Sequence, residues 1–266
     1  MAENFEKKER YGYDDLIRVM EILRGPGGCP WDIEQTHESI RKNFIEETYE
    51  VLEAIDSGDK THLQEELGDV LLQVVFHARM EEEAGSFSME DVCDGICKKL
   101  ILRHPHIFGD VRADSAEQVL KNWDEIKKKE KSQKTAADTL RSVPKLLPAL
   151  MRAEKVQHRA ARAGFDYDGL AGAMGDLESE CAELREAVDA GSAEEQAEEL
   201  GDLLFAAVNV SRFLHTDPEE TLARATEKFI GRFCRVEELA LERGIDMQGA
   251  SLQELDVLWR EAKKQH

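Results

Sequence analysis

Two stretches of the chain share one arrangement of acidic residues: ETYEVLEAIDSGDKTHLQEELGD at residues 47–69 and ECAELREAVDAGSAEEQAEELGD at residues 180–202. Each stretch carries four carboxylates at the same spacing, and the two sets lie half of the 266-residue chain apart. The repeat predicts two copies of one structural unit. The four acidic residues are Glu47, Glu50, Glu66 and Asp69 in the first stretch and Glu180, Glu183, Glu199 and Asp202 in the second.

Each stretch is predicted to form an αα-hairpin about a central glycine, Gly58 or Gly191. The sequence before each glycine has no proline and few β-branched residues, and glycine commonly ends a helix. After the glycine, Thr61 and Ser192 each precede a Gln or Glu by three residues, which is the spacing of a capping box. A second helix is therefore expected to begin there and to fold back on the first.

The hairpin brings the four carboxylates of each copy together. Acids three residues apart in one helix share a face and lie one turn apart. Antiparallel folding about Gly58 places Glu47 level with Asp69, and Glu50 level with Glu66. At a rise of 1.5 Å per residue, the four side chains converge roughly 16 Å from the turn.

Four converging carboxylates predict a divalent metal ion. Like charges in a partly dry cleft repel one another unless a cation lies among them or their pKa values rise. Ligation by carboxylates alone favours Mg²⁺, with Mn²⁺ as a substitute, over zinc or copper. For a single Glu-x-x-Glu pair, a solvated acidic surface is the commoner explanation. Two symmetric sets favour the metal site, because each also keeps a mid-helix glycine that costs about 1 kcal/mol relative to alanine.

The rest of the chain predicts an all-α protein. Apolar residues recur at helical spacing over residues 67–78, and further helices are expected over residues 13–23 and 89–102. No segment shows the period-two alternation of a strand. The stretch from Ile126 onward, IKKKEKSQKTAADT, lacks large apolar residues and is predicted to be a linker.

That linker predicts two domains, at residues 1–134 and 135–266, with catalysis assigned to the second.

Charge and cysteine content restrict the class of protein. A net charge of −21 and a pI near 4.8 argue against nucleic acid and anionic membranes as partners. Five cysteines, with no secretory signal or apolar run of membrane length, favour reduced thiols and a cytoplasmic location. A zinc site is disfavoured, because the only Cys and His cluster fits no common zinc pattern; its members are Cys93, Cys97, His104 and His106. In the loop GGCPWDIEQTH, packing and capping roles are favoured for Trp31 and His37.

The second half carries cationic and aromatic residues that suit a metal-bound polyphosphate. Lys228 and Arg232 are four residues apart and share a helix face, where they can offset phosphate charge. Trp259 and Lys263 have the same spacing, and the indole can stack on a base whatever its identity. Alone, the basic pair is more often a surface pair and the tryptophan more often a core residue.

Taken together, the motifs resemble the MazG-type nucleoside triphosphate pyrophosphohydrolases of the all-α NTP pyrophosphatase superfamily. The resemblance covers nearly the whole chain, through GCPWDIEQTHES, EETYEVLEAI, EELGDVLLQVVFHA, RHPHIFGD, GFDY, EELGDLLFAAVNVSR, EKFIGRF and WREAKKQ. It implies tandem MazG-like helical domains, with hairpins that form four-helix bundles on pairing in a homodimer. The implied reaction is hydrolysis of NTPs or dNTPs to the monophosphate and pyrophosphate, with broad base specificity.

The resemblance also assigns roles to residues. The implied magnesium ligands are Glu180, Glu183, Glu199 and Asp202. The implied nucleotide contacts are Lys228, Arg232, Trp259 and Lys263.

Three positions of the second half depart from the family pattern. Ser179 replaces the first Glu of EExxE, Asp176 stands where Lys is common, and Thr226 stands where Asn often precedes KF. Loss of a lysine near the phosphates is expected to weaken nucleotide binding. The first half keeps Glu46-Glu47-x-x-Glu50 but lacks an equivalent of EKFIGRF, so its site is expected to bind metal without necessarily hydrolysing the substrate.

Two rival functions remain open at this stage. A carboxylate-bridged di-metal oxidoreductase usually needs Glu-x-x-His on facing helices, whereas both copies here have Glu-x-x-Asp. A non-catalytic helical scaffold or regulatory nucleotide-binding protein would be favoured if neither Mg²⁺ nor NTP bound.

Overall fold

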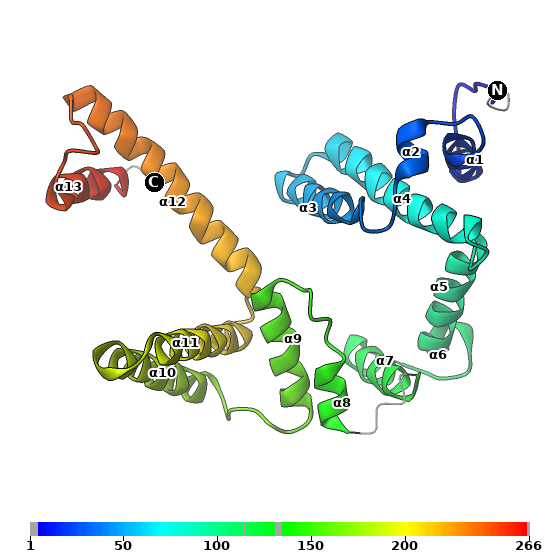
Figure 1. Ribbon diagram of the computed structural model, residues 1–266. Helices are drawn as coiled ribbons and strands as arrows, with labels where there is room; N and C mark the ends of the chain where they lie inside the picture. The colour runs from blue at the N-terminus through cyan, green and yellow to red at the C-terminus, as the bar shows by residue number, and fades with distance from the viewer. Residues whose placement is uncertain (1–4, 114, 131–134, 265–266) are drawn as a thin grey trace. The chain divides into compact units, whose positions relative to one another are not determined.

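In the computed structural model, every regular element of the described residues, 5–113, 115–130 and 135–264, is a helix (Figure 1). The all-α prediction is therefore confirmed. Internal contacts divide the chain into two compact units, residues 1–127 and 128–266. Among the described residues, no helix combines the length and apolarity needed to cross a membrane.

The first unit is built around the α3–α4 hairpin, with α1 and α5 packed against α4. Its core contains the buried residues Met20, Ile40, Val75, Phe76 and Met80. Its helices are α1 (Tyr13–Arg24), α2 (Pro30–Glu34), α3 (Arg41–Ser57), α4 (Lys60–Glu83), α5 (Met89–Arg103), α6 (Pro105–Phe108) and α7 (Ala116–Glu130), the last of which crosses the boundary between the units.

The second unit contains the α10–α11 hairpin and the paired helices α12 and α13. Helix α9 packs against α11 and also contacts α12. A small core between α12 and α13 consists of Val236, Leu239, Ala240, Leu258 and Ala262. The helices are α8 (Ala136–Arg141), α9 (Ala149–Arg162), α10 (Leu170–Ala190), α11 (Ala193–Phe213), α12 (Pro218–Arg243) and α13 (Leu252–Ala262).

The stretch predicted as a linker is helical on both sides of residues 131–134, which lie outside the described residues. Helix α7 continues to Glu130, and α8 begins at Ala136. The boundary between the two units, after Lys127, falls within this stretch, and helices form on either side of residues 131–134 because Lys, Glu and Ala favour helix.

The two central glycines end their helices for different reasons. Gly58 has φ +69°, in the left-handed region, and a Cβ there would meet no atom within 4 Å. Its requirement is therefore conformational. Gly191 has φ −87°, which any residue can adopt, but a Cβ there would lie 2.6 Å from the carbonyl oxygen of Ala187. Its requirement is therefore steric.

The second helix of each hairpin has a side-chain N-cap, although only one cap matches the prediction. The Ser192 hydroxyl accepts a hydrogen bond from the Glu195 amide at 3.3 Å, which completes the predicted capping box. In the first hairpin the cap is Asp59, which accepts from the amides of Thr61 and His62 at 2.9 and 3.2 Å. The expected Thr61 cap was wrong because the helix begins at Lys60, two residues earlier than that cap allows.

Candidate metal and nucleotide site

The hairpin of the first unit gathers its four predicted carboxylates. Glu47 of α3 and Glu66 and Asp69 of α4 each place an oxygen within 4.8 Å of the others. Glu50 lies close enough to Glu47 and Glu66 to raise the pKa of both carboxyl groups. Glu66 is 7% exposed, so one acid of this cluster lies inside the protein. The palindromic spacing of the sequence thus predicted which side chains meet.

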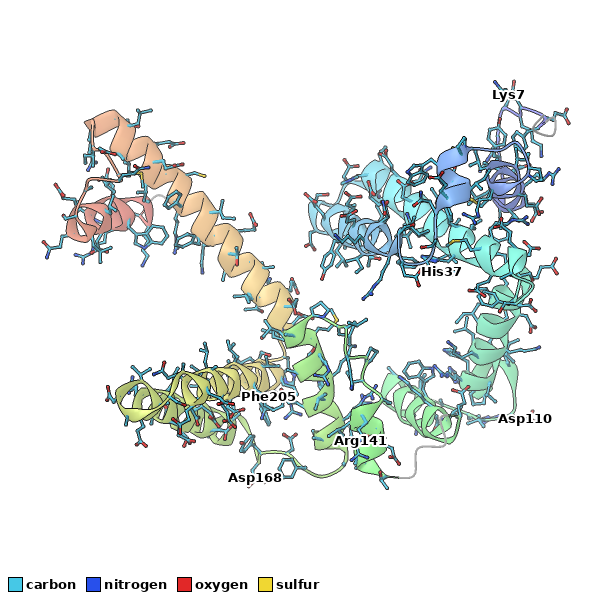
Figure 2. All side chains as sticks on the ribbon, in the orientation of Figure 1. Lys7, His37, Asp110, Arg141, Asp168 and Phe205 are labelled. Atoms are coloured by element: carbon cyan, nitrogen blue, oxygen red, sulfur yellow. The ribbon has the colours of Figure 1, made fainter. Side chains whose placement is uncertain are left out.

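The α10–α11 hairpin of the second unit forms the equivalent cluster. Glu180, Glu199 and Asp202 place one oxygen each within 4.8 Å of one another. Glu183 lies close enough to Glu180 and Glu199 to raise the pKa of both carboxyl groups. Figure 2 shows the described side chains of this hairpin on the ribbon, with oxygen atoms in red.

Two of the unusual positions in the second unit contact this cluster. The Ser179 hydroxyl donates a hydrogen bond to Glu183 at 2.9 Å, so it orients a carboxylate instead of supplying one. Asp176 adds a fifth negative charge beside Glu180. Asp176 also accepts a hydrogen bond from Tyr167; burial, followed by this contact, raises the pKa of the phenol to about 12. Helical spacing indicated two of these contacts weakly, since Ser179 and Glu183 are four residues apart on α10, as are Asp176 and Glu180.

Both clusters hold their acids in an environment that disfavours ionisation. Burial is the main reason why the carboxyl pKa values of Glu47 and Glu66 are raised, and neighbouring carboxylates add to the effect. The same causes raise the pKa values of Glu180 and Glu199. His62, 3.1 Å from Glu66, opposes the shift without reversing it. A divalent cation among the oxygens would offset this repulsion.

The donor sets fit a hard cation. All of the donors are carboxylate oxygens, and within each cluster they lie within 4.8 Å of one another. Modest side-chain movement would place each oxygen roughly 2.1 Å from a central Mg²⁺, the distance typical of that ion. Within the described residues, the carboxylate clusters are the two groups of acidic, His or Cys side chains that could hold a metal. The disfavoured Cys and His zinc site, comprising Cys93, Cys97, His104 and His106, forms no such group.

Three of the predicted nucleotide contacts lie on α12 and α13, and Lys263 lies at the C-cap of α13. The Trp259 ring packs against Phe229, with 5.2 Å between ring centroids, and the Lys263 ammonium lies 6.0 Å from the Trp259 centroid. Lys228 and Arg232 lie on the same helix as Phe229. The Nε atom of Arg232 is buried and has no hydrogen-bond partner among the described residues.

The structure therefore forms two separate groups from the predicted site residues. The carboxylates lie on the α10–α11 hairpin, and the cationic and aromatic residues lie on α12 and α13. Within the described part of the chain, no ion pair joins Lys228 or Arg232 to the four acids.

An ion pair fixes the start of the loop that carries Tyr167. Arg212 of α11, whose side chain is almost fully buried, contacts both carboxylate oxygens of Asp166. This contact anchors the loop to the hairpin one residue before the tyrosine that bonds Asp176. The sequence did not indicate this pair, because Arg212 and Asp166 lie 46 positions apart.

Comparison with known proteins identifies relatives of both halves. The family model described as the MazG nucleotide pyrophosphohydrolase domain matches residues 35–108 and 172–236. The chain is 45% identical over 251 residues to the nucleoside triphosphate pyrophosphohydrolase/pyrophosphatase MazG of Thermotoga maritima, covering 94% of this chain and 95% of the relative. It is 45% identical over 258 residues to the nucleoside triphosphate pyrophosphohydrolase of Escherichia coli K12, covering 95% and 97%. Similarity to YabN of Bacillus subtilis, also 45%, covers 97% of this chain and 53% of that protein.

The charge repulsion predicts a pH-dependent effect of removing one acid. A raised carboxyl pKa means that the folded state binds more protons than the unfolded state above about pH 4.5. These groups therefore lower the free energy of unfolding as pH rises from about 4.5 through their raised pKa values. Glu66→Gln or Glu199→Gln is expected to raise the thermal midpoint of the metal-free protein at pH 7. The gain should shrink as pH falls toward 4.5.

Calorimetric melting in EDTA between pH 5 and 8 measures this effect. Glu65→Gln is a matched control, because Glu65 is exposed on the same helix and lies outside the cluster. A lower midpoint for Glu66→Gln than for this control at pH 7 would contradict the repulsion argument.

Proposed function

The chain belongs to the MazG nucleotide pyrophosphohydrolase family, and we propose that it hydrolyses nucleoside triphosphates, both NTPs and dNTPs, to monophosphate and pyrophosphate with Mg²⁺. Mn²⁺ is proposed as a substitute metal. The observation that carries the proposal is the convergence of carboxylate oxygens on one side of each hairpin. Such a site suits a triphosphate bound through a metal ion, because without the metal the acids would repel the negative charge of the triphosphate.

In the proposed mechanism, four acids of the second unit hold the metal: Glu180, Glu183, Glu199 and Asp202. Bound Mg²⁺ supplies polarisation of the phosphate and a lower pKa for a coordinated water. Ser179 keeps Glu183 oriented through their hydrogen bond. The proposed bond cleavage is at the α-phosphorus, with pyrophosphate as the leaving group.

The cationic residues of α12 and α13 serve the rest of the nucleotide in this proposal. Lys228 and Arg232 stabilise the charge that develops on the leaving pyrophosphate. The unpaired, buried Nε of Arg232 supports this role, because a buried donor without a partner favours a ligand that can accept its hydrogen bond. Trp259 stacks on the base with Lys263 beside it, and stacking tolerates different bases, which supports broad base specificity.

We assign catalysis to the second unit, residues 135–266 as divided by the sequence, and metal binding without hydrolysis to the first unit, residues 1–134. Only in the second unit are the acids followed, along the chain, by the basic and aromatic residues of α12 and α13. The acids Glu47, Glu50, Glu66 and Asp69 are proposed to hold a second metal ion.

We further propose a homodimer in which hairpins pair into four-helix bundles. Each hairpin leaves large apolar side chains exposed, which a second hairpin would cover. They include Tyr49, Leu52, Leu67 and Leu71 in the first unit and Leu200, Leu204 and Phe205 in the second. Light scattering should give twice the single-chain mass of 30.1 kDa; the single-chain mass would exclude the dimer.

The remaining parts of the proposal concern partners and place. The substrate is a nucleotide, while nucleic acid and membranes are excluded as partners on the strength of the −21 charge, and the protein acts in the cytoplasm. Binding to duplex DNA or to anionic vesicles at 0.15 M salt would contradict the exclusion of these partners. Fractionation of cells tests the cytoplasmic location. No described contact favours the oxidoreductase or scaffold alternatives.

The proposed reaction predicts its products and its metal requirement. With ATP or dCTP, chromatography should find monophosphate and pyrophosphate as the first products in the presence of Mg²⁺ or Mn²⁺. EDTA should abolish turnover, and Ca²⁺ should support it poorly, because its larger and looser coordination shell positions a nucleophile less tightly. Nucleoside diphosphate and orthophosphate as first products would exclude attack at the α-phosphorus.

Equivalent substitutions in the two units test which one is catalytic. Glu183→Gln keeps the shape of the side chain and removes a ligand charge, so it should lower kcat by about 10²-fold or more. Its counterpart Glu50→Gln should leave most turnover intact. Steady-state kinetics of both variants, with circular dichroism as a check of folding, makes the comparison. If Glu50→Gln is inactive and Glu183→Gln is not, catalysis belongs to the first unit, whose EETYE motif is intact.

A further inference from the structure

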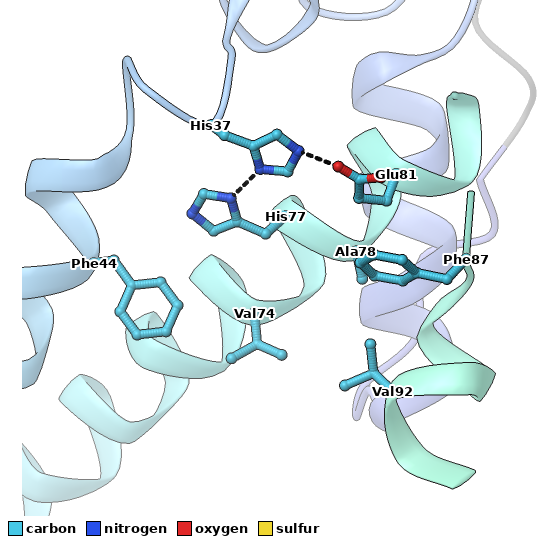
Figure 3. Close-up of a pocket in the computed structure, with 8 residues that line it drawn as sticks. All are labelled: His37, Phe44, Val74, His77, Ala78, Glu81, Phe87 and Val92. Atoms are coloured by element: carbon cyan, nitrogen blue, oxygen red, sulfur yellow. Dashed lines mark hydrogen bonds and ion pairs between the residues drawn. The ribbon is translucent and has the colours of Figure 1, made fainter. Parts of the chain in front are cut away.

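A hollow of about 440 Å³ lies in the first unit, beside the far end of α4 from the hairpin turn (Figure 3). This volume lies within the range of roughly 300–1,000 Å³ typical of small-molecule sites. Its walls are mainly apolar, with three polar side chains on one side. The lining residues are Phe44, Val74, Ala78, Phe87, Val92, His37, His77 and Glu81.

The three polar side chains form one hydrogen-bonded chain. His37 Nε2 lies 2.8 Å from Glu81 Oε1, and His37 Nδ1 lies 2.6 Å from His77 Nδ1. The two imidazole planes differ by only 4°, with centroids 4.9 Å apart. The centroid separation equals the nitrogen–nitrogen distance plus the distance from each nitrogen to its own ring centroid. Both nitrogens therefore lie on the line that joins the centroids. The rings therefore lie edge to edge in a common plane, and the contact is a hydrogen bond instead of face-to-face stacking.

The carboxylate fixes the direction of this chain when both imidazoles are neutral. Ionised Glu81 can only accept, so His37 carries its proton on Nε2 and presents Nδ1 as an acceptor. His77 must then donate through Nδ1, which leaves its Nε2 as an acceptor. Burial, followed by the nearby His37 ring, lowers the pKa of His77, which favours its neutral form.

The free acceptor of His77 lies at the hollow. Figure 3 shows the second ring nitrogen of His77 directed away from His37, on the side of Phe44. This nitrogen has no hydrogen-bond partner among the described residues, so it is an acceptor available to a ligand. A ligand that donates one hydrogen bond would satisfy it.

We propose that this hollow binds a small neutral aromatic or heteroaromatic molecule that donates an N–H or O–H to His77 Nε2. The walls contributed by Phe44, Phe87 and Val92 contact the apolar body of the ligand. No Lys or Arg lines the hollow, and Glu81 does, so a phosphate or carboxylate group has no counter-charge there. The site therefore accepts a different class of ligand from the proposed triphosphate site, and neither proposal depends on the other.

A matched pair of probes tests the proposal on the full-length protein. Indole has one N–H donor, while 1-methylindole has a similar shape and no donor. Calorimetry at pH 8 should show indole binding at least about tenfold more tightly, since the methyl compound has no donor for His77 Nε2. Equal affinities, no saturable binding of indole below about 1 mM, or tighter binding of benzoate than of indole would each overturn it.

Two variants identify the residue responsible. His77→Leu replaces the acceptor with an apolar side chain, so this variant should bind both indoles with equal affinity. His158→Leu, in α9 of the second unit, is the control and should keep the tenfold preference. A preference that survives His77→Leu would overturn the assignment. If His77→Leu does not fold, as judged by circular dichroism, Val92→Phe, which fills the hollow, should abolish binding of both probes; unchanged binding in this variant would place the ligand elsewhere.

Discussion

Repulsion among carboxylates held at one level of an αα-hairpin is the constraint on which both units depend. The hairpin must be rigid enough to hold acids such as Glu66, which is 7% exposed, against neighbours of the same charge. Capped helix starts at Asp59 and Ser192 and the two central glycines supply that rigidity near the turn. The carboxyl pKa values are raised mainly by burial and further by the neighbouring carboxylates.

The sequence contained enough information to predict the hairpins and the membership of each acidic cluster. Spacing of three residues within a helix and symmetry about Gly58 and Gly191 are local rules, so they can be read without knowledge of tertiary contacts. The all-α class followed in the same way. The contact between His37 and His77 could not be predicted, because 40 residues separate them and the loop before α3 determines where His37 lies. Packing and capping roles had been favoured for His37, whereas it instead bridges two side chains of α4.

Other features emerged only from the structure. The stretch from Ile126 was predicted as a linker, and α7 extends through its first residues. The spacing of Ser179 and Glu183 was visible, yet sequence alone could not show that the hydroxyl points to the acid. The four nucleotide-binding candidates stay predictions, and α12 and α13, where they lie or end, share a small core of their own.

The edge-to-edge arrangement of the two imidazoles lets a residue from outside α4 join two side chains of that helix. Glu81 and His77 lie four residues apart on α4, and His37 bridges them with a hydrogen bond to each. With neutral rings, each hydrogen bond fixes the direction of the next, because an imidazole nitrogen that accepts leaves the proton on the other nitrogen. The hydrogen-bonding role of the His77 nitrogen at the hollow is therefore set by a carboxylate two hydrogen bonds away.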